Sequence, residues 1–125
     1  LLSHTRVLEK ILRVSNNHFE ALPDSLGQLE LVELLVNGNK LTVFPGSSGL
    51  VGKAWKNHLK TLDLRDNALL SFPVGIRSLK QLEVLQMKRN RFTLEGSARL
   101  ALELPKLRVF SAPGEVDGDD TSAVR

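Results

Sequence analysis

The sequence contains no cysteine and no tyrosine, and it has one tryptophan and one methionine. The absence of cysteine excludes disulfides, a thiolate nucleophile and sulfur-ligated zinc, and it favours a reducing compartment. Aromatic residues make up only 5% of the chain. Leucine carries about half of the apolar content, so we expect a core built from repeated equivalent positions.

Long apolar runs are also absent. No run approaches the ~20 residues needed to span a bilayer, and the first residues show no basic-then-apolar secretory signal. The sequence starts at Leu1 rather than at methionine, as a truncated or processed chain would. We therefore expect an intracellular protein with no membrane partner, most simply a cytoplasmic one, with nuclear and organellar locations left open.

The charge is unevenly distributed along the chain. The formal net charge is +3, but residues 112–125 hold four acids and one base, which leaves the rest of the chain at +6. The tail is also rich in small residues and glycine, and it is predicted to be disordered. A basic body suits an acidic protein surface or nucleic acid, and charge alone does not choose between them.

The most informative stretch is residues 59–73, which read LKTLDLRDNALLSFP. Leu62 and Leu64 alternate as they would on a short strand with one buried face. The flanking apolar residues and Asn67 indicate a turn after the strand. Equivalent stretches surround Asn17, Asn39 and Asn90, and the four asparagines are 22, 28 and 23 residues apart. Such a unit cannot bury its apolar side alone, so the copies are expected to stack.

This pattern resembles the leucine-rich repeat family, whose unit reads L-x-x-L-x-L-x-x-N-x-L-x-x-L-P. The Leu-Pro and Phe-Pro endings are similar to those of intracellular members. The segment SARLALEL followed by ELPKLRVF (97–110) is similar to the C-terminal cap of the axonemal dynein light chain, although the tyrosine and final aspartate of that cap are missing. The resemblance implies an α/β fold, a right-handed solenoid with a short parallel sheet on its concave side.

The resemblance predicts one repeat domain over residues 1–111, followed by the acidic tail. Short helical turns are expected at Pro23–Leu29 and Val74–Leu79 on the convex side. The repeats are expected to start near residues 9, 31, 59, 82 and 104, with strands near 12–14, 34–36, 62–64, 85–87 and 107–109.

Two repeats depart from the pattern. Glu9 stands where the other repeats begin with leucine, so the first repeat is either a cap or the continuation of an upstream repeat. The second repeat carries an insertion, GSSGLVGKAWKNH (46–58). Its glycines predict a flexible start and its apolar residues a short helix on the convex side or at one edge. Trp55 in this helix is expected either to pack onto the repeats or to contact a partner.

Motifs that suggest chemistry have simpler structural explanations. The four asparagines can satisfy backbone groups where the chain leaves each strand. The segment GSSGLVGK (46–53) departs from a phosphate-binding loop, because it has one residue too many and lacks the Ser or Thr that holds magnesium. The three histidines have no carboxylate or serine at the spacing of a triad or a metal site. We therefore expect no cofactor, no metal and no catalysis.

The remaining positions form the predicted binding surface. Counting from the first residue of each repeat (Leu59 is position 1), positions 3, 5 and 7 should point outward from the sheet: Ile11, Arg13, Ser15, Glu33, Leu35, Asn37, Thr61, Asp63, Arg65, Val84, Gln86, Lys88, Lys106, Arg108 and Phe110. Five bases then face two acids, with a few apolar anchors, a mixture typical of protein interfaces. The predicted partner-binding residues are Arg13, Leu35, Trp55, Asp63, Arg65, Gln86, Lys88, Arg89 and Arg108.

These residues predict a non-catalytic protein-interaction module or scaffold subunit that binds an acidic protein surface. A place within a large assembly is compatible with this prediction. The alternative is a basic accessory subunit of a ribonucleoprotein that contacts RNA phosphates. That alternative lacks the aromatic stacking platform of dedicated RNA binders.

Overall fold

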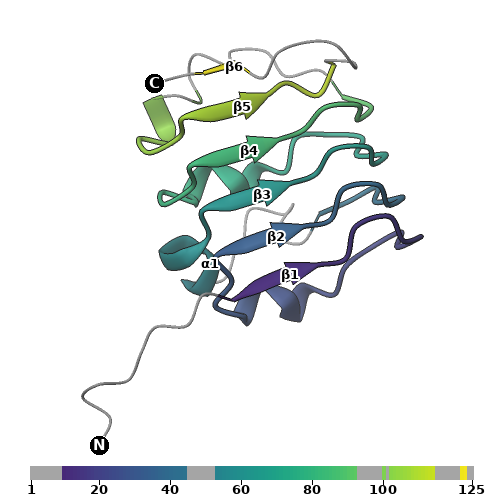
Figure 1. Cartoon of the computed structure of the whole chain (residues 1–125), viewed down its shortest axis with the longest axis horizontal. Coiled ribbons are helices and arrows are strands. Elements are labelled where there is room, and N and C mark those ends of the chain that lie inside the picture. The colour runs from purple at the N-terminus through teal and green to yellow at the C-terminus, as the bar shows by residue number, and fades with distance from the viewer. Residues whose placement is uncertain (1–9, 45–52, 93–99, 101, 115–121, 124–125) are drawn as a thin grey trace, which may run out of the picture.

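The computed structural model describes residues 10–44, 53–92, 100, 102–114 and 122–123. Short strands alternate with connections that return behind the sheet, so each repeat forms one turn of a stack (Figure 1). The elements in chain order are β1 (Ile11–Arg13), η2 (Asp24–Gln28), β2 (Glu33–Leu35), α1 (Lys53–His58), β3 (Thr61–Asp63), η3 (Val74–Ser78), β4 (Val84–Gln86), β5 (Val109–Ser111) and β6 (Ser122–Ala123).

The strands form one sheet in sequence order, β1-β2-β3-β4-β5-β6. The first five are parallel, and the register keeps equivalent repeat positions side by side: Leu12, Leu34, Leu62 and Leu85 are successive partners. The first four strands lie within one residue of their predicted places. The sequence prediction of an α/β repeat fold with a short parallel sheet is therefore confirmed.

Apolar residues at repeat positions 4 and 6, with leucine predominating at position 4, fill the core between the sheet and the returning chain. Leu34, Leu62, Leu64 and Leu85 have no exposed surface. Every second residue of a strand points to the same face, which explains why these positions are apolar while their neighbours are not. Phe72 and Phe92 pack edge to face further back, with 6.4 Å between ring centroids.

Asn39, Asn67 and Asn90 satisfy backbone groups where the chain leaves the strand, as predicted, and they also join neighbouring repeats. The amide of Asn67 donates to the carbonyl of Leu64 in its own repeat and to that of Val36 in the preceding repeat, both at 3.1 Å. Its Oδ1 accepts from the backbone N–H of Leu41 at 3.1 Å. Asn39 and Asn90 make the equivalent bonds. Each side chain therefore satisfies backbone groups that the turn after the strand leaves open.

The back of the stack carries the 3₁₀ helices η2 and η3 in the two segments predicted to be helical. The insertion contributes α1, which packs against η2 and so lies on the same side. Trp55 fixes this helix. Its indole N–H donates to the carbonyl of Leu26 at 3.1 Å, and its ring lies 5.6 Å from that of Phe44. The glycine-rich start predicted for the insertion lies outside the described residues.

The last parallel strand was predicted in the wrong register. The prediction placed it at 107–109 in a repeat starting near 104, whereas β5 spans Val109–Ser111 and Phe110 pairs with Leu85. The fifth repeat therefore starts at Leu107. Phe110 occupies core position 4 and is 4% exposed, rather than pointing outward. The prediction failed because an aromatic residue replaces leucine at position 4. Leu104, at the end of the preceding helical turn, was therefore taken for the first residue of the repeat.

The tail also differs from its prediction at one point. Ser122 and Ala123 pair with β5 in antiparallel fashion as β6, although 112–125 was predicted to be disordered. Pairing with a strand edge uses backbone groups, so composition does not reveal it. Half of the helical run predicted for 97–104 lies outside the described residues, and Leu100, Leu102 and Glu103 in the other half are helical. At its end, the N–H of Leu104 donates to the carbonyl of Leu100 at 2.9 Å, as in a helix.

Candidate binding surface

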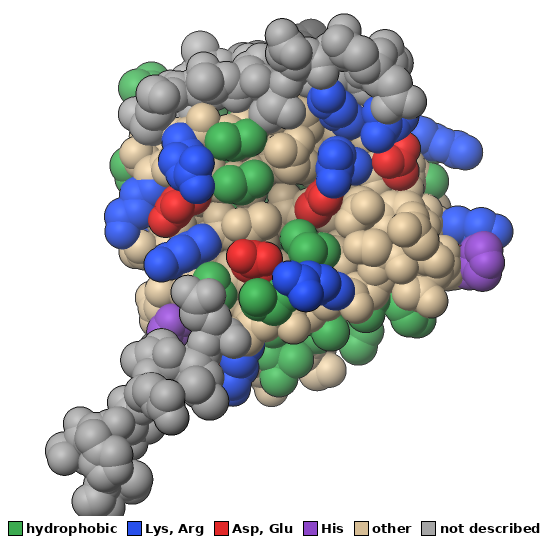
Figure 2. Space-filling view, in the orientation of Figure 1, with side chains coloured by type: hydrophobic (Ala, Val, Ile, Leu, Met, Phe, Trp, Pro, Cys, Tyr) green, Lys and Arg blue, Asp and Glu red, His purple; other side chains and the backbone are tan. Residues whose placement is uncertain are grey.

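The outward side of the parallel strands is the first part of the candidate site. This sheet face consists of the residues at positions 3 and 5: Ile11, Arg13, Glu33, Leu35, Thr61, Asp63, Val84, Gln86, Val109 and Ser111. Ser111 has no exposed surface, so a partner could not contact it. Arg13, Leu35, Asp63 and Gln86 form one continuous row across β1–β4, so the register brings together four of the predicted binding residues. Figure 2 views the molecule with the strands in front, and basic side chains lie next to acidic ones, with apolar side chains between them.

Val84 and Val109 form an apolar pair that sequence reasoning missed, because the wrong register hid the outward position of Val109. They are directly paired across β4 and β5, and both are half-buried. A second apolar group lies at the other end, where Ile11 is 40% exposed and Leu35 is half-buried. Between the two groups, β3 presents only polar side chains, Thr61 and Asp63.

Asp63 and Arg65 form a bidentate ion pair at the centre of the sheet. Arg65 donates from Nε to Oδ1 at 2.9 Å and from Nη2 to Oδ2 at 2.7 Å. The backbone N–H of Arg65 also donates to Oδ1 at 3.1 Å. The hydrogen bond to Asp63 raises the pKa of Arg65 above its ordinary value. The Asp63 side chain is only 9% exposed and that of Arg65 is 38% exposed, so a partner would meet the arginine and not the acid.

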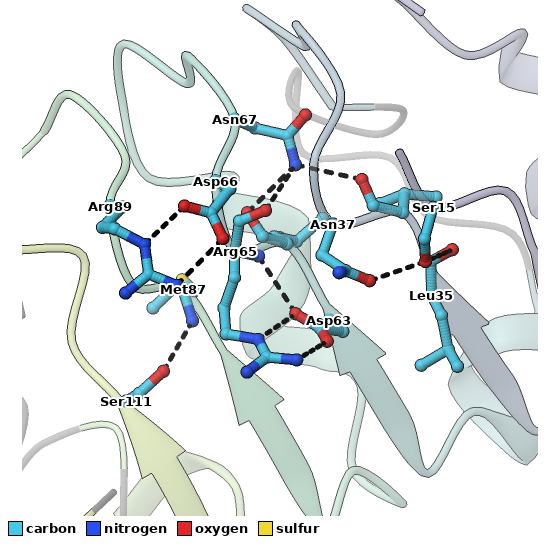
Figure 3. Close-up of polar contacts among 12 residues, drawn as sticks. Ser15, Leu35, Asn37, Asp63, Arg65, Asp66, Asn67, Met87, Arg89 and Ser111 are labelled. Atoms are coloured by element: carbon cyan, nitrogen blue, oxygen red, sulfur yellow. Dashed lines mark hydrogen bonds and ion pairs between the residues drawn. The ribbon is translucent and has the colours of Figure 1, made fainter. Parts of the chain in front are cut away.

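The second part of the site is the polar edge, where the chain turns after each strand. It comprises positions 7 to 9: Ser15, Asn16, Asn17, Asn37, Gly38, Asn39, Arg65, Asp66, Asn67, Lys88, Arg89 and Asn90 (Figure 3 labels several of them). Ser15 donates to the side-chain oxygen of Asn37 at 2.7 Å. Neighbouring repeats therefore contact each other through side chains along this edge as well as through the backbone.

Position 8 of the repeat has a left-handed backbone in the first four repeats. The φ angles are 58° at Asn16, 75° at Gly38, 56° at Asp66 and 59° at Arg89. Asn, Asp and Gly tolerate this region, whereas arginine adopts it at a cost. A Cβ at Gly38 would also lie 2.2 Å from Oδ1 of Asn16, so the Asn16 side chain would have to move.

Arg89 and Asp66 form the second ion pair, between position 8 of adjacent repeats. Arg89 Nη2 donates to Asp66 Oδ2 at 2.9 Å, and Nε donates to Oδ1. The hydrogen bond from Arg89 lowers the pKa of Asp66, with a further contribution from the charge of Arg65. Asp66 was not among the predicted site residues. The sequence could have indicated Asp66, because position 8 lies in the same turn of every repeat. The prediction considered only the outward positions 3, 5 and 7 and so left it out.

The corrected register reduces the basic character predicted for the sheet. Lys106 and Arg108 precede β5, and Arg108 stands at position 2, where its Nε lies 3.4 Å from Glu83 Oε1. The outward positions 3, 5 and 7 of the described strands then carry three bases, Arg13, Arg65 and Lys88, against the acids Glu33 and Asp63. The surface is one of mixed charge rather than a basic patch.

Trp55 does not belong to this surface. It is 1% exposed on the opposite side of the stack, so of the two roles expected for it the structure supports packing. His18 is exposed, and His58 lies 3.9 Å from Glu30, while His4 falls outside the described residues. Within the described ranges, no group of three or more His, Cys, Asp or Glu side chains could hold a metal ion.

Comparisons with known proteins agree with this architecture. A family model for the leucine-rich repeat matches residues 58–79, the third repeat. The solved structure of an LRR protein from Leptospira interrogans superposes with a TM-score of 0.65 and 30% sequence identity over 82% of this chain. The chain belongs to the leucine-rich repeat family. It spans 25% of the Leptospira chain, so it matches about a quarter of that protein's length.

No curated protein matches the chain. Leucine-rich repeat domains generally mediate protein–protein interactions. Among the residues that the structure describes, no helix is long and apolar enough to cross a membrane.

Proposed function

We propose that this leucine-rich repeat protein is a non-catalytic interaction module that binds a folded protein through its sheet face. The repeats would form a right-handed solenoid with the sheet on its concave side. Solenoids commonly bind through such extended surfaces. We further propose a scaffold or subunit role in a cytoplasmic assembly, supported by the cysteine-free composition.

The observation that carries this proposal is the fixed position of Arg65 between two apolar groups. Asp63 holds the guanidinium through two parallel hydrogen bonds, and the remaining N–H groups of its five donors can bind a partner. An arginine already held in place loses little side-chain entropy on binding. Arginine is also enriched among the residues that dominate binding energy.

The proposed partner surface has an acceptor opposite Arg65 and apolar side chains that cover Val84 and Val109. The sequence predicted a partner with an acidic surface, and we now propose a less acidic one. One carboxylate or carbonyl group near Arg65 suffices, because the sheet carries bases and acids in similar number. The same balance weakens the RNA alternative, since phosphate binding depends on accumulated positive charge.

The experiment compares the wild-type protein with two variants, and thermal unfolding first verifies that each variant is folded at the temperature of the titration. A partner recovered by affinity purification is titrated calorimetrically against Val84→Glu combined with Arg65→Gln. We expect at least a tenfold loss of affinity. The control is Leu70→Glu, which changes a side chain that is 62% exposed and lies outside the sheet face, and its affinity should match wild type. Equal binding by the double variant would overturn the site.

Salt dependence separates the proposed function from the RNA alternative. Binding to a folded protein through Arg65 and apolar contacts should weaken little between about 50 and 200 mM salt. Binding to RNA phosphates would fall log-linearly over this range. A steep loss with RNA and no protein partner would favour the ribonucleoprotein role.

A further inference from the structure

At the N-terminal end of the stack, residues at core positions remain partly exposed. Leu12 and Val14 stand at core positions 4 and 6, yet they remain half-buried, whereas their equivalents in the next three repeats have no exposed surface. Further back, Phe19 is 42% exposed and Leu29 is 46% exposed. Their counterparts Leu41, Leu69, Leu79 and Phe92 are 8% exposed or less.

The backbone of β1 is equally open on this side. In β2, Glu33 donates its N–H to the carbonyl of Lys10 at 3.3 Å, and the carbonyl of Leu35 accepts from Val14 at 2.9 Å. Ile11 and Arg13 hold the same positions in β1 and direct the same groups away from β2. In the described part of the chain, these groups have no backbone partner.

The hydrogen bonds that Asn17 lacks indicate which groups a neighbour at this end would have to supply. Its amide donates only within its own turn, to Val14 and Ser15. In each of the next three repeats, the asparagine amide also donates to the position 6 carbonyl of the preceding repeat, and Oδ1 accepts the position 11 N–H of that repeat. Asn39, for example, makes these bonds with Val14 and Phe19. Oδ1 of Asn17 has no donor among the described residues.

The next residue repeats the pattern. The position 10 N–H donates to the position 11 carbonyl of the preceding repeat at Lys40, Ala68 and Arg91, at distances of 2.8–3.0 Å. His18 stands at position 10 and has no such partner among the described residues. A complete set of groups that join one repeat to the preceding one is therefore presented at this end.

We propose that this end binds one further leucine-rich repeat, joined through the chain on the N-terminal side and adding a parallel strand to β1. A generic apolar peptide would cover Leu12 and Phe19, but it would not supply a carbonyl and an N–H in the spacing that Asn17 and His18 require. A second copy cannot supply them through its other end, where β6 pairs antiparallel with β5 and Phe110 is covered.

The test adds such a repeat to the full chain. Residues 1–8 are replaced by a copy of residues 59–81, so that the copied repeat ends directly before Glu9. The control is the same fusion with Leu62→Asp and Leu64→Asp in the copy, which cannot pack. Hydrogen exchange is measured at the amides of Ile11 and Arg13, together with the urea midpoint of unfolding.

We expect the fusion to slow exchange at both amides by at least about tenfold relative to the control, and to raise the urea midpoint. Asn17→Ala should lower the midpoint clearly more in the fusion than in the original chain. Unchanged exchange, or an equal effect of Asn17→Ala in both proteins, would overturn the proposal.

Sedimentation of the original chain tests whether a second copy of the chain binds at this end instead. We expect a monomer at all concentrations. A dimer in which the Ile11 and Arg13 amides become protected as concentration rises would show that a second copy fills this end, and would also overturn the proposal. Because partner binding at the sheet face is measured separately with Val84 and Arg65, either proposal can fail alone.

Discussion

At the scale of single residues, four asparagines occupy the same repeat position but have different surroundings. Asn67 is buried and bonded to groups of two repeats, while Asn17 is exposed and bonded only within its own turn. The role of the asparagines could be predicted from sequence because the spacing of the repeats requires it. Their unequal importance could not, since it depends on which neighbours are present.

The substitution Asn67→Ala should therefore lower the free energy of unfolding by about 2–4 kcal/mol, because buried carbonyls and an N–H lose their partners. The same change at Asn17 should cost less than about 1 kcal/mol, since water replaces the lost bonds. Urea unfolding of the two variants measures the difference, and similar losses would contradict the role assigned to the inter-repeat bonds.

Asp66 predicts a pH dependence. Its pKa is lowered in the folded protein by Arg89, so its contribution to stability is complete above the unfolded pKa of about 4 and is lost as pH falls through the folded value. The stability difference between wild type and Asp66→Asn should thus be constant near neutrality and shrink below about pH 4. The pair is partly exposed, so the difference should stay under about 1 kcal/mol. Thermal unfolding between pH 3 and 7 checks this; a difference that grows in acid would contradict it.

At the scale of elements, the first four strands were predictable because Leu-x-Leu followed by Asn recurs without ambiguity. The last strand was not predictable, since Phe110 and Ala112 stand where the Leu-x-Leu pattern is expected. Leu104 was taken for the first residue of that repeat instead of Leu107. The candidate site inherited this error. Arg65, Gln86 and Lys88 stand at the outward repeat positions predicted for them, while Arg108 and Phe110 do not.

The register of β5 has a direct test. Phe110→Ala should cost about 3–5 kcal/mol, because it leaves a cavity in the core. Arg108→Ala should cost less than about 1 kcal/mol, since it removes only an exposed ion pair with Glu83. If denaturant unfolding gave the reverse order, the strand would lie in the register first predicted from sequence.

At the scale of the whole molecule, each repeat contacts only its neighbours, so the position of a repeat in the stack decides how much a core residue contributes. Leu62 has neighbours on both sides and Leu12 on one, although both stand at position 4. A pattern in the sequence assigns both to the core equally. Only the structure separates an interior repeat from a terminal one.

Leu62→Ala should consequently destabilise the protein by about 2–5 kcal/mol, and Leu12→Ala by less than half of that amount. Calorimetric melting of both variants in the same buffer provides the comparison. Equal losses would mean that the first repeat is covered as completely as the third.

The burial of Trp55 has an optical consequence. With one tryptophan and no tyrosine in the chain, the near-ultraviolet emission of the protein arises almost entirely from an indole that is packed beside Phe44 and bonded to Leu26. That emission is a built-in reporter of whether α1 stays docked on η2. A ligand on the sheet face would leave its wavelength unchanged, whereas opening of the inserted segment would shift it to the red.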